Sequence, residues 1–172
     1  RADPSWLARM GDVTVHRGPD DSGAFVDGPC AIGMRRLSIV DLSGGHQPIP
    51  NEDESLWIVF NGEIFNHEPL RRGLVERGHQ FRTRSDTEVV LRAIIEWGER
   101  ALPRFDGGYA FALLQERTGR LVLARDPWGK RPLYTARRGD GALFFASEIR
   151  ALRAVAGLSF ELDPSRLARI FT

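Results

Sequence analysis

The order of the predicted elements indicates an α+β fold in which two mainly antiparallel sheets lie between outer helices. Short apolar segments separated by turn residues come first, two amphipathic helices follow, and further strands and a helix complete the chain. A regular strand–helix alternation, which would indicate a parallel sheet, is not found. The 172 residues contain no internal repeat and no linker-like segment, so we expect one domain over 1–172.

The first third of the chain predicts one short helix followed by strands. Asp3-Pro4 is typical of a capped helix start. A loop rich in glycine, proline and aspartate follows over 16–23. Strands are predicted over 23–26, 30–34 and 37–42, and the uninterrupted apolar run over 56–60 predicts a strand that is buried on both faces.

Two helices are predicted in the middle of the chain. They cover 68–78 and 85–98, and each ends at a glycine. Because Glu88 lies three residues after Ser85, we expect a capping box in which Glu88 binds the backbone N–H of Ser85.

The last third of the chain predicts a second series of strands, over 109–114, 121–125, 132–136 and 143–146. Hairpin turns are expected at 118–119 and 139–141. We expect Ser147 to cap a short helix that ends near residue 156, and Asp163-Pro164 to begin another helix.

The composition narrows the class of protein. The formal net charge is +1 and acidic residues are interleaved with basic ones, so we expect no nucleic-acid partner. No apolar run approaches the roughly 18 residues of a membrane helix, so no membrane partner is expected. The single cysteine, Cys30, fits a reducing compartment, and we expect a cytoplasmic protein with an inert thiol at this position. The four histidines lack metal-ligand spacing, so no metal site is expected.

Three groups that are distant in sequence form a candidate binding set. The guanidinium of Arg36 suits a carboxylate ligand, although a structural ion pair with an acid of the chain explains it equally well. Asn61-Gly62 predicts a turn on local grounds, or else an oxyanion hole formed by the Asn61 side-chain NH₂ and the Gly62 backbone N–H. Asp86 either caps its helix or, if Ser85 takes the cap, binds an ammonium group. Together these groups would hold a small zwitterion while one of its carbonyls is attacked.

Seven motifs accompany this set: HRGPDDSG at 16–23, RRLSIVDLSGGHQP at 35–48, NGEIFN at 61–66, SDTE at 85–88, YAFAL at 109–113, ARDPWGKRPLY at 124–134 and FASEIRAL at 145–152. In this order they resemble class II glutamine amidotransferase domains, and most of all the glutaminase domain of glutamine-hydrolysing asparagine synthetases. The resemblance covers nearly the whole chain. It implies a four-layer α/β/β/α sandwich of two antiparallel sheets, of the N-terminal nucleophile hydrolase type, here lacking its first strand.

The resemblance also implies a role for each site residue. The α-carboxylate of glutamine would pair with Arg36, and its α-ammonium group would meet Glu63 and Asp86. Asn61 and Gly62 would form the oxyanion hole over the side-chain amide. The implied glutamine-binding residues are Arg36, Leu37, Val40, Asn61, Gly62, Glu63 and Asp86.

The family nucleophile is an N-terminal cysteine whose own α-amine acts as the base. This chain begins with Arg1, and Cys30 has no free α-amine, so we expect the chain to be N-terminally truncated and inactive by itself in glutamine hydrolysis. Loss of an interior strand would leave an unpaired sheet edge beside an apolar groove.

We therefore expect most of the glutaminase domain of an asparagine synthetase, a ligase that uses aspartate, ATP and glutamine. No cofactor is expected in this chain, since ATP and Mg²⁺ would bind the C-terminal synthetase domain, which is absent from it. L-glutamine and that synthetase domain are the expected partners, and a homodimer is left open. Two alternatives stay open: a non-catalytic glutamine-binding or interaction module, and an amidotransferase-like enzyme that forms another amide, such as a peptide cyclase.

Overall fold

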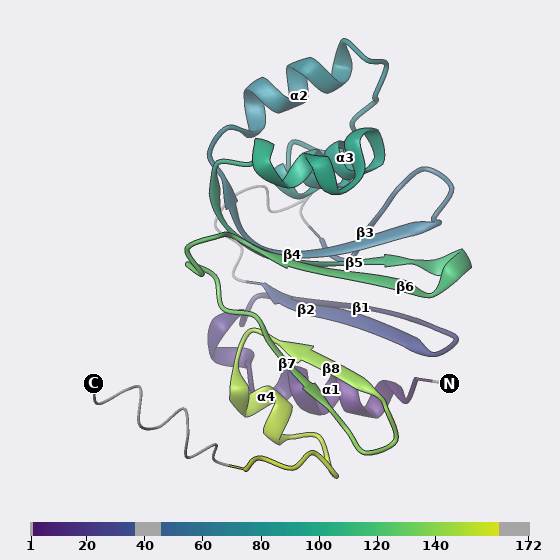
Figure 1. Ribbon diagram of the computed structural model, residues 1–172, viewed down its shortest axis with the longest axis vertical. Helices are drawn as coiled ribbons and strands as arrows, with labels where there is room; N and C mark the ends of the chain where they lie inside the picture. Colours follow the sequence, from purple (N-terminus) through teal and green to yellow (C-terminus); the bar gives the residue numbers. More distant parts are fainter. Residues whose placement is uncertain (1, 37–45, 162–172) are drawn as a thin grey trace.

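The computed structural model describes residues 2–36 and 46–161, and it shows sheets stacked between helices (Figure 1). One sheet has four strands in the order β3-β4-β5-β6, and β1-β2 and β7-β8 form two-stranded sheets. Each of these ladders is antiparallel. The strands are β1 (Asp21–Asp27), β2 (Cys30–Arg36), β3 (Ile49–Pro50), β4 (Leu56–Ile64), β5 (Gly107–Gln115), β6 (Arg120–Arg125), β7 (Tyr134–Arg137) and β8 (Leu143–Ala146).

Helices lie on the outer sides of the stacked sheets. α2 and α3 cover the four-stranded sheet, whereas α1 and α4 lie on the side of the two-stranded sheets (Figure 1). This arrangement confirms the predicted α+β fold with helices outside. The helices are α1 (Pro4–Asp12), α2 (His67–Val75), α3 (Asp86–Trp97) and α4 (Ile149–Arg153), with 3-10 turns η1 (Val15–Arg17), η2 (Gly98–Arg104) and η3 (Glu116–Thr118).

The sheet layer farther from α3 is divided into two parts. No ladder joins β1-β2 to β7-β8 within the ranges that the structure describes. The two pairs are connected instead through helices, since α1 contacts both β2 and α4, and α4 contacts both β7 and β8. The antiparallel sandwich is therefore confirmed, with one of its sheet layers in two pieces.

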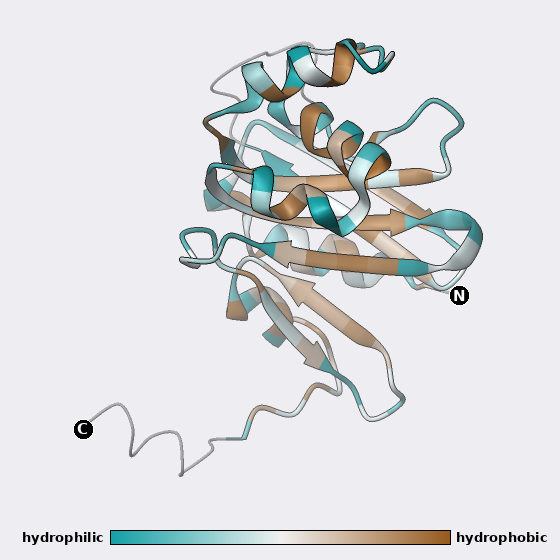
Figure 2. Ribbon diagram, turned by 45° about the horizontal axis from the view of Figure 1, so that its top comes forward, coloured by the Kyte–Doolittle hydropathy of each residue, from teal (hydrophilic) through white to brown (hydrophobic). Residues whose placement is uncertain are grey.

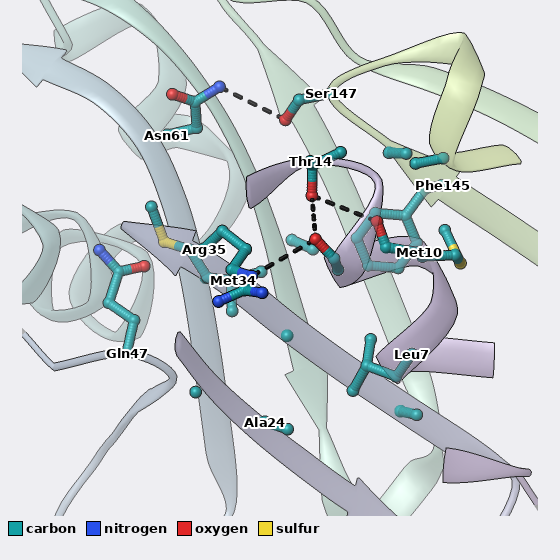
Figure 3. Close-up of a pocket in the computed structure, with 18 of the residues that line it drawn as sticks. Leu7, Met10, Thr14, Ala24, Met34, Arg35, Gln47, Asn61, Phe145 and Ser147 are labelled. Atoms are coloured by element: carbon teal, nitrogen blue, oxygen red, sulfur yellow. Dashed lines mark hydrogen bonds between the residues drawn. The ribbon is translucent and has the colours of Figure 1, made fainter. Parts of the chain in front are cut away.

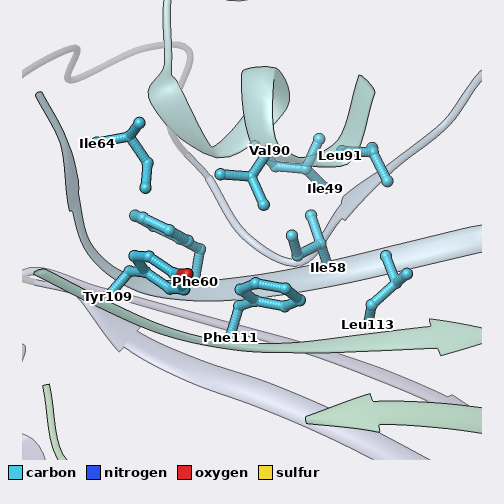
Figure 4. Close-up of a cluster of buried hydrophobic side chains, with 9 residues drawn as sticks. All are labelled: Ile49, Ile58, Phe60, Ile64, Val90, Leu91, Tyr109, Phe111 and Leu113. Atoms are coloured by element: carbon cyan, nitrogen blue, oxygen red, sulfur yellow. The ribbon is translucent and has the colours of Figure 1, made fainter. Parts of the chain in front are cut away.

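The main hydrophobic core lies between α3 and the four-stranded sheet (Figure 4). Its alternating strand residues face Val90 and Leu91 of the helix, and a second cluster around Ile32 fills the space between the stacked sheets. Figure 2 shows hydrophobic residues concentrated along the strands and hydrophilic ones at the hairpin ends. The main core consists of Ile49, Ile58, Phe60, Ile64, Val90, Leu91, Tyr109, Phe111 and Leu113.

Two predictions about helix caps are wrong. Glu88 does not bind Ser85; its carboxylate accepts the N–H groups of Arg82 and Thr83 at 2.7–3.1 Å, which the preceding loop would otherwise leave without an acceptor. Ser147 does not cap α4, whose N-cap is Glu148. The other predicted strands and helices are confirmed, except that the predicted strand over 37–42 and the helix from 163 lie outside the described residues.

Candidate functional site

A single cavity of about 1510 Å³ contains every candidate site residue that the structure describes. Its walls come from α1, β1, β2, β4, β8 and the start of α3, and Figure 3 shows part of this lining. The predicted residues on its surface are Arg36, Asn61, Gly62, Glu63 and Asp86. The two remaining candidates, Leu37 and Val40, lie outside the described residues.

The Asn61-Gly62 pair does not form the turn that local sequence favours. β4 continues to Ile64, and Asn61 and Gly62 are paired with Ala110 and Tyr109 of β5. Gly62 has φ of +151°, and a Cβ at this position would overlap the carbonyl oxygen of Gly108. Only glycine fits this conformation and this close approach of two backbones, so the residue type is fixed by the strand pairing itself.

The amide of Asn61 is oriented by a residue that sequence reasoning assigned elsewhere. Asn61 Nδ2 donates a hydrogen bond of 3.4 Å to Ser147 Oγ, which joins the end of β8 to β4 across the cavity (Figure 3). The two residues are 86 positions apart, so no local pattern could have linked them. The Asn61 NH₂ group therefore lies at the cavity wall with a hydroxyl as its neighbour.

Asp86 is not the N-cap of α3, in agreement with one of the two alternatives that the sequence left open. Ser85 is the N-cap of α3 and accepts the backbone N–H of Thr87 at 3.0 Å. Asp86 Oδ2 instead accepts the backbone N–H of Ile64 at 3.0 Å, which ties the start of α3 to the end of β4. Burial raises the pKa of the Asp86 carboxyl, and the nearby Glu63 carboxylate adds to this, although the Ile64 N–H and His67 act in the opposite direction. Two neighbouring carboxylates at a half-buried site favour a cation between them.

Arg36 closes the same cavity from the end of β2, where it lies directly opposite Asp21 of β1. Its positive charge contributes to the lowered pKa of Asp21, for which the hydrogen bond from His46 is the largest cause. The structure thus places Arg36 both beside an acid of the chain and on the surface of the cavity. The two interpretations offered by the sequence are compatible with this position.

Cys30 lies outside this arrangement. It begins β2 and is half-buried, and it is not among the residues that line the cavity. Burial, together with the charge of Asp27, raises the pKa of its thiol, which lowers the fraction of reactive thiolate. In the described ranges no group of three or more His, Cys, Asp or Glu side chains could hold a metal ion, and no helix there is long and apolar enough to cross a membrane.

Comparison with known proteins identifies the family of this chain. The model of one protein family, the glutamine amidotransferase domain, matches residues 1–172. The chain belongs to this family. The cavity of this amidotransferase domain presents charged groups of both signs next to an amide and a glycine backbone.

Individual relatives and solved structures agree with the family assignment. The chain is 42% identical to asparagine synthetase [glutamine-hydrolyzing] 1 of Bacillus subtilis over 161 residues, covering 94% of this chain and 25% of that protein. It is 45% identical to asparagine synthetase [glutamine-hydrolyzing] 3 of Arabidopsis thaliana over 137 residues, covering 80% and 23%. The amidotransferase domain therefore spans about a quarter of the length of these relatives.

The fold also matches that of a solved structure. Glutamine phosphoribosylpyrophosphate amidotransferase from B. subtilis superposes with a TM-score of 0.62 at 29% identity, covering 78% of this chain and 31% of that one. The similarity confirms the predicted sandwich of the N-terminal nucleophile hydrolase type.

Proposed function

We propose that this chain is the glutamine-binding part of a glutamine-hydrolysing asparagine synthetase. The observation that carries the proposal is the meeting of Arg36, Asn61, Gly62, Glu63 and Asp86 in one cavity, although β2, β4 and α3 bring them from distant parts of the sequence. Identity of 42% to an asparagine synthetase over nearly the whole chain supports the choice of this branch of the family.

In this proposal the two charged ends of glutamine are held separately. The guanidinium of Arg36 pairs with the α-carboxylate, for which its planar fork is suited. Glu63 and Asp86 receive the α-ammonium group, whose charge stabilises the ionised form of the half-buried Asp86. Leu37 and Val40 contribute to the same subsite. The side-chain amide of glutamine is then directed toward Asn61 and Gly62.

The chemistry at that amide is nucleophilic substitution by a thiol. The sulfur bonds to the amide carbon, and the Asn61 NH₂ and the Gly62 N–H stabilise the oxyanion. The C–N bond breaks as the nitrogen takes the thiol proton and leaves as ammonia, and water hydrolyses the thioester to glutamate. Cys30 lies off the cavity, so we propose that the thiol and its α-amine base come from outside these 172 residues.

In the longer protein the ammonia would be used to convert aspartate to asparagine. The relatives are about four times the length of the matched region, which leaves room for a synthetase domain. ATP and Mg²⁺ would bind that domain, and the protein would work in the cytoplasm. No ATP site is proposed in the chain itself.

Calorimetric titration of the chain with L-glutamine tests the proposal. We expect binding of L-glutamine, and marked loss of binding for D-glutamine and for glutaramic acid, which lacks the α-amine. Asp86→Asn and Arg36→Lys should each weaken binding by roughly tenfold or more, because each removes one charge-assisted contact.

The chain offers matched controls for these two substitutions. Asp53 and Arg117 form an exposed ion pair away from the cavity, so Asp53→Asn and Arg117→Lys should leave glutamine binding unchanged. Absence of glutamine binding, or equal binding of glutaramic acid, would refute the proposed function.

A further inference from the structure

Gln47 is a buried polar residue to which neither the sequence motifs nor the proposed chemistry give a role. It lies just before β3, is 7% exposed and forms part of the cavity wall (Figure 3). Its side-chain amide is used at both ends: Oε1 accepts the backbone N–H of Phe60 at 2.7 Å, and Nε2 donates to Thr87 Oγ1 at 3.2 Å. Both partners are themselves buried.

These partners are the immediate neighbours of proposed glutamine contacts. Phe60 precedes Asn61 on β4, and Thr87 follows Asp86 on α3. One side chain therefore bridges the strand that carries the proposed oxyanion hole and the helix that carries the proposed ammonium ligand. The direct Ile64–Asp86 hydrogen bond joins the same two elements at the far side of Asn61.

The strand register explains why a side chain is needed here. β3 pairs with β4 only at Ile49–Ile58 and Pro50–Trp57, and continuation of that ladder would place Gln47 opposite Phe60. Pro48 has no N–H with which to continue the ladder. The side-chain carbonyl of Gln47 takes the place of a neighbouring strand's carbonyl, and its NH₂ group remains available for the helix.

The backbone of Gln47 is fixed as well. Its carbonyl oxygen approaches Gly23 of β1 so closely that a Cβ on Gly23 would overlap it. Gln47 is thus seated between β1, β4 and α3, three elements that all contribute to the cavity. A residue held on three sides can set the separation of its neighbours.

We propose that Gln47 is a positioning residue for glutamine: its amide fixes the distance between the end of β4 and the start of α3, and so between Asn61 and Asp86. The proposal rests on the proposed function, because it assigns Gln47 an effect on the same ligand. Gln47 touches the elements that hold the ligand and does not itself supply a charge to it.

Thr87 provides the matched pair of variants that tests the bridge. Thr87→Ser keeps the hydroxyl and should bind glutamine within about twofold of the unaltered chain, whereas Thr87→Val keeps the shape, loses the hydroxyl and should bind several-fold more weakly. Gln47→Met removes both hydrogen bonds at similar volume and should weaken binding by about tenfold.

A coupling measurement separates positioning from simple structural support. Asp86→Asn should lower glutamine affinity strongly in the unaltered chain but much less in the Gln47→Met background, because Asp86 is already displaced there. Simple loss of stability would lower the melting temperature and leave the effect of Asp86→Asn unchanged. If Gln47→Met does not fold, the Thr87→Val background takes its place in the cycle.

The outcomes can be told apart from failure of the proposed function. No glutamine binding by the unaltered chain overturns the proposed function and this inference with it. Binding by the unaltered chain that Thr87→Val retains in full, with undiminished sensitivity to Asp86→Asn, overturns this inference alone.

Discussion

At the scale of single residues, the partly buried carboxyl group of Asp86 sets the electrostatics of the site. The Asp86 carboxylate interacts with the backbone N–H groups of Ile64 and Thr87, and the Glu63 carboxylate lies close enough to act on it. Burial therefore dominates and the pKa of Asp86 is raised, in contrast to Asp21, whose pKa is lowered chiefly by its hydrogen bond with His46. A bound ammonium group would supply a positive charge next to Asp86 and so stabilise its ionised form.

This asymmetry predicts a pH dependence of glutamine binding. A cationic ligand favours ionised Asp86, so binding should release protons where the free site is partly protonated, and affinity should rise with pH through the raised pKa of Asp86. Titrations from about pH 4 to about pH 7.5 would show weaker binding at the acidic end. In Asp86→Asn this dependence should shrink; an unchanged pH profile in that variant would contradict the assignment.

At the scale of elements, buried carboxylates organise the loops that local sequence leaves undefined. Asp126, which directly follows β6, is 1% exposed and accepts four backbone N–H groups, from Tyr109, Trp128, Lys130 and Arg131, at 3.0–3.2 Å. Burial alone would raise the pKa of Asp126, but these four donors together hold it below its usual range. The loop between β6 and β7 is therefore folded around one charge.

Removal of that charge should destabilise the chain. Asp126→Asn leaves backbone donors without an acceptor and should lower the free energy of unfolding by about 3 kcal/mol at neutral pH, measured by urea titration. Because the folded-state pKa is lowered, the contribution of Asp126 is present above its unfolded pKa and is lost as the pH falls through the folded one. The difference in the free energy of unfolding between Asp126→Asn and the unaltered chain should thus become smaller at acidic pH. The exposed Asp53→Asn should show no comparable deficit at neutral pH.

How well a feature is predicted from the sequence depends on how far apart in the chain the interacting residues are. Strands and helices with clear periodicity, such as β4 and α3, are predicted within a few residues because their signal is local. The turn that local sequence favours at Asn61-Gly62 does not form, because pairing with β5, far along the chain, overrides the local turn preference. The contacts of Gln47 and Ser147 reach across 13 to 86 residues and could not be anticipated.

At the scale of the whole molecule, stability is distributed unevenly between the layers. β4 has neighbours on both sides and contributes three fully or nearly fully buried residues, Ile58, Phe60 and Ile64, to the main core. In the part of the chain that the structure describes, β7 and β8 pair only with each other, and their residues are exposed or half-buried. Two-stranded sheets depend on their neighbours for stability.

Hydrogen exchange should reveal this difference. We expect the amides of β4 and β5 to exchange only on global unfolding, and those of β7 and β8 to exchange by local opening with much less protection. Amide exchange followed by nuclear magnetic resonance would measure both sets in one sample. Equal protection of the two sheets would show that the β7-β8 pair is as firmly held as the main core.

The backbone at Gly62 has a practical consequence for anyone who diversifies this segment. Because Gly108 occupies the space where a side chain would begin, a randomised library over 61–63 will return only glycine at its middle position in any screen for folded protein. Glu63, whose side chain is exposed, will tolerate many replacements in that screen and few in a selection on glutamine. Comparison of the substitutions accepted in the folding screen with those accepted in the glutamine selection would separate residues needed for the fold from residues needed for the ligand.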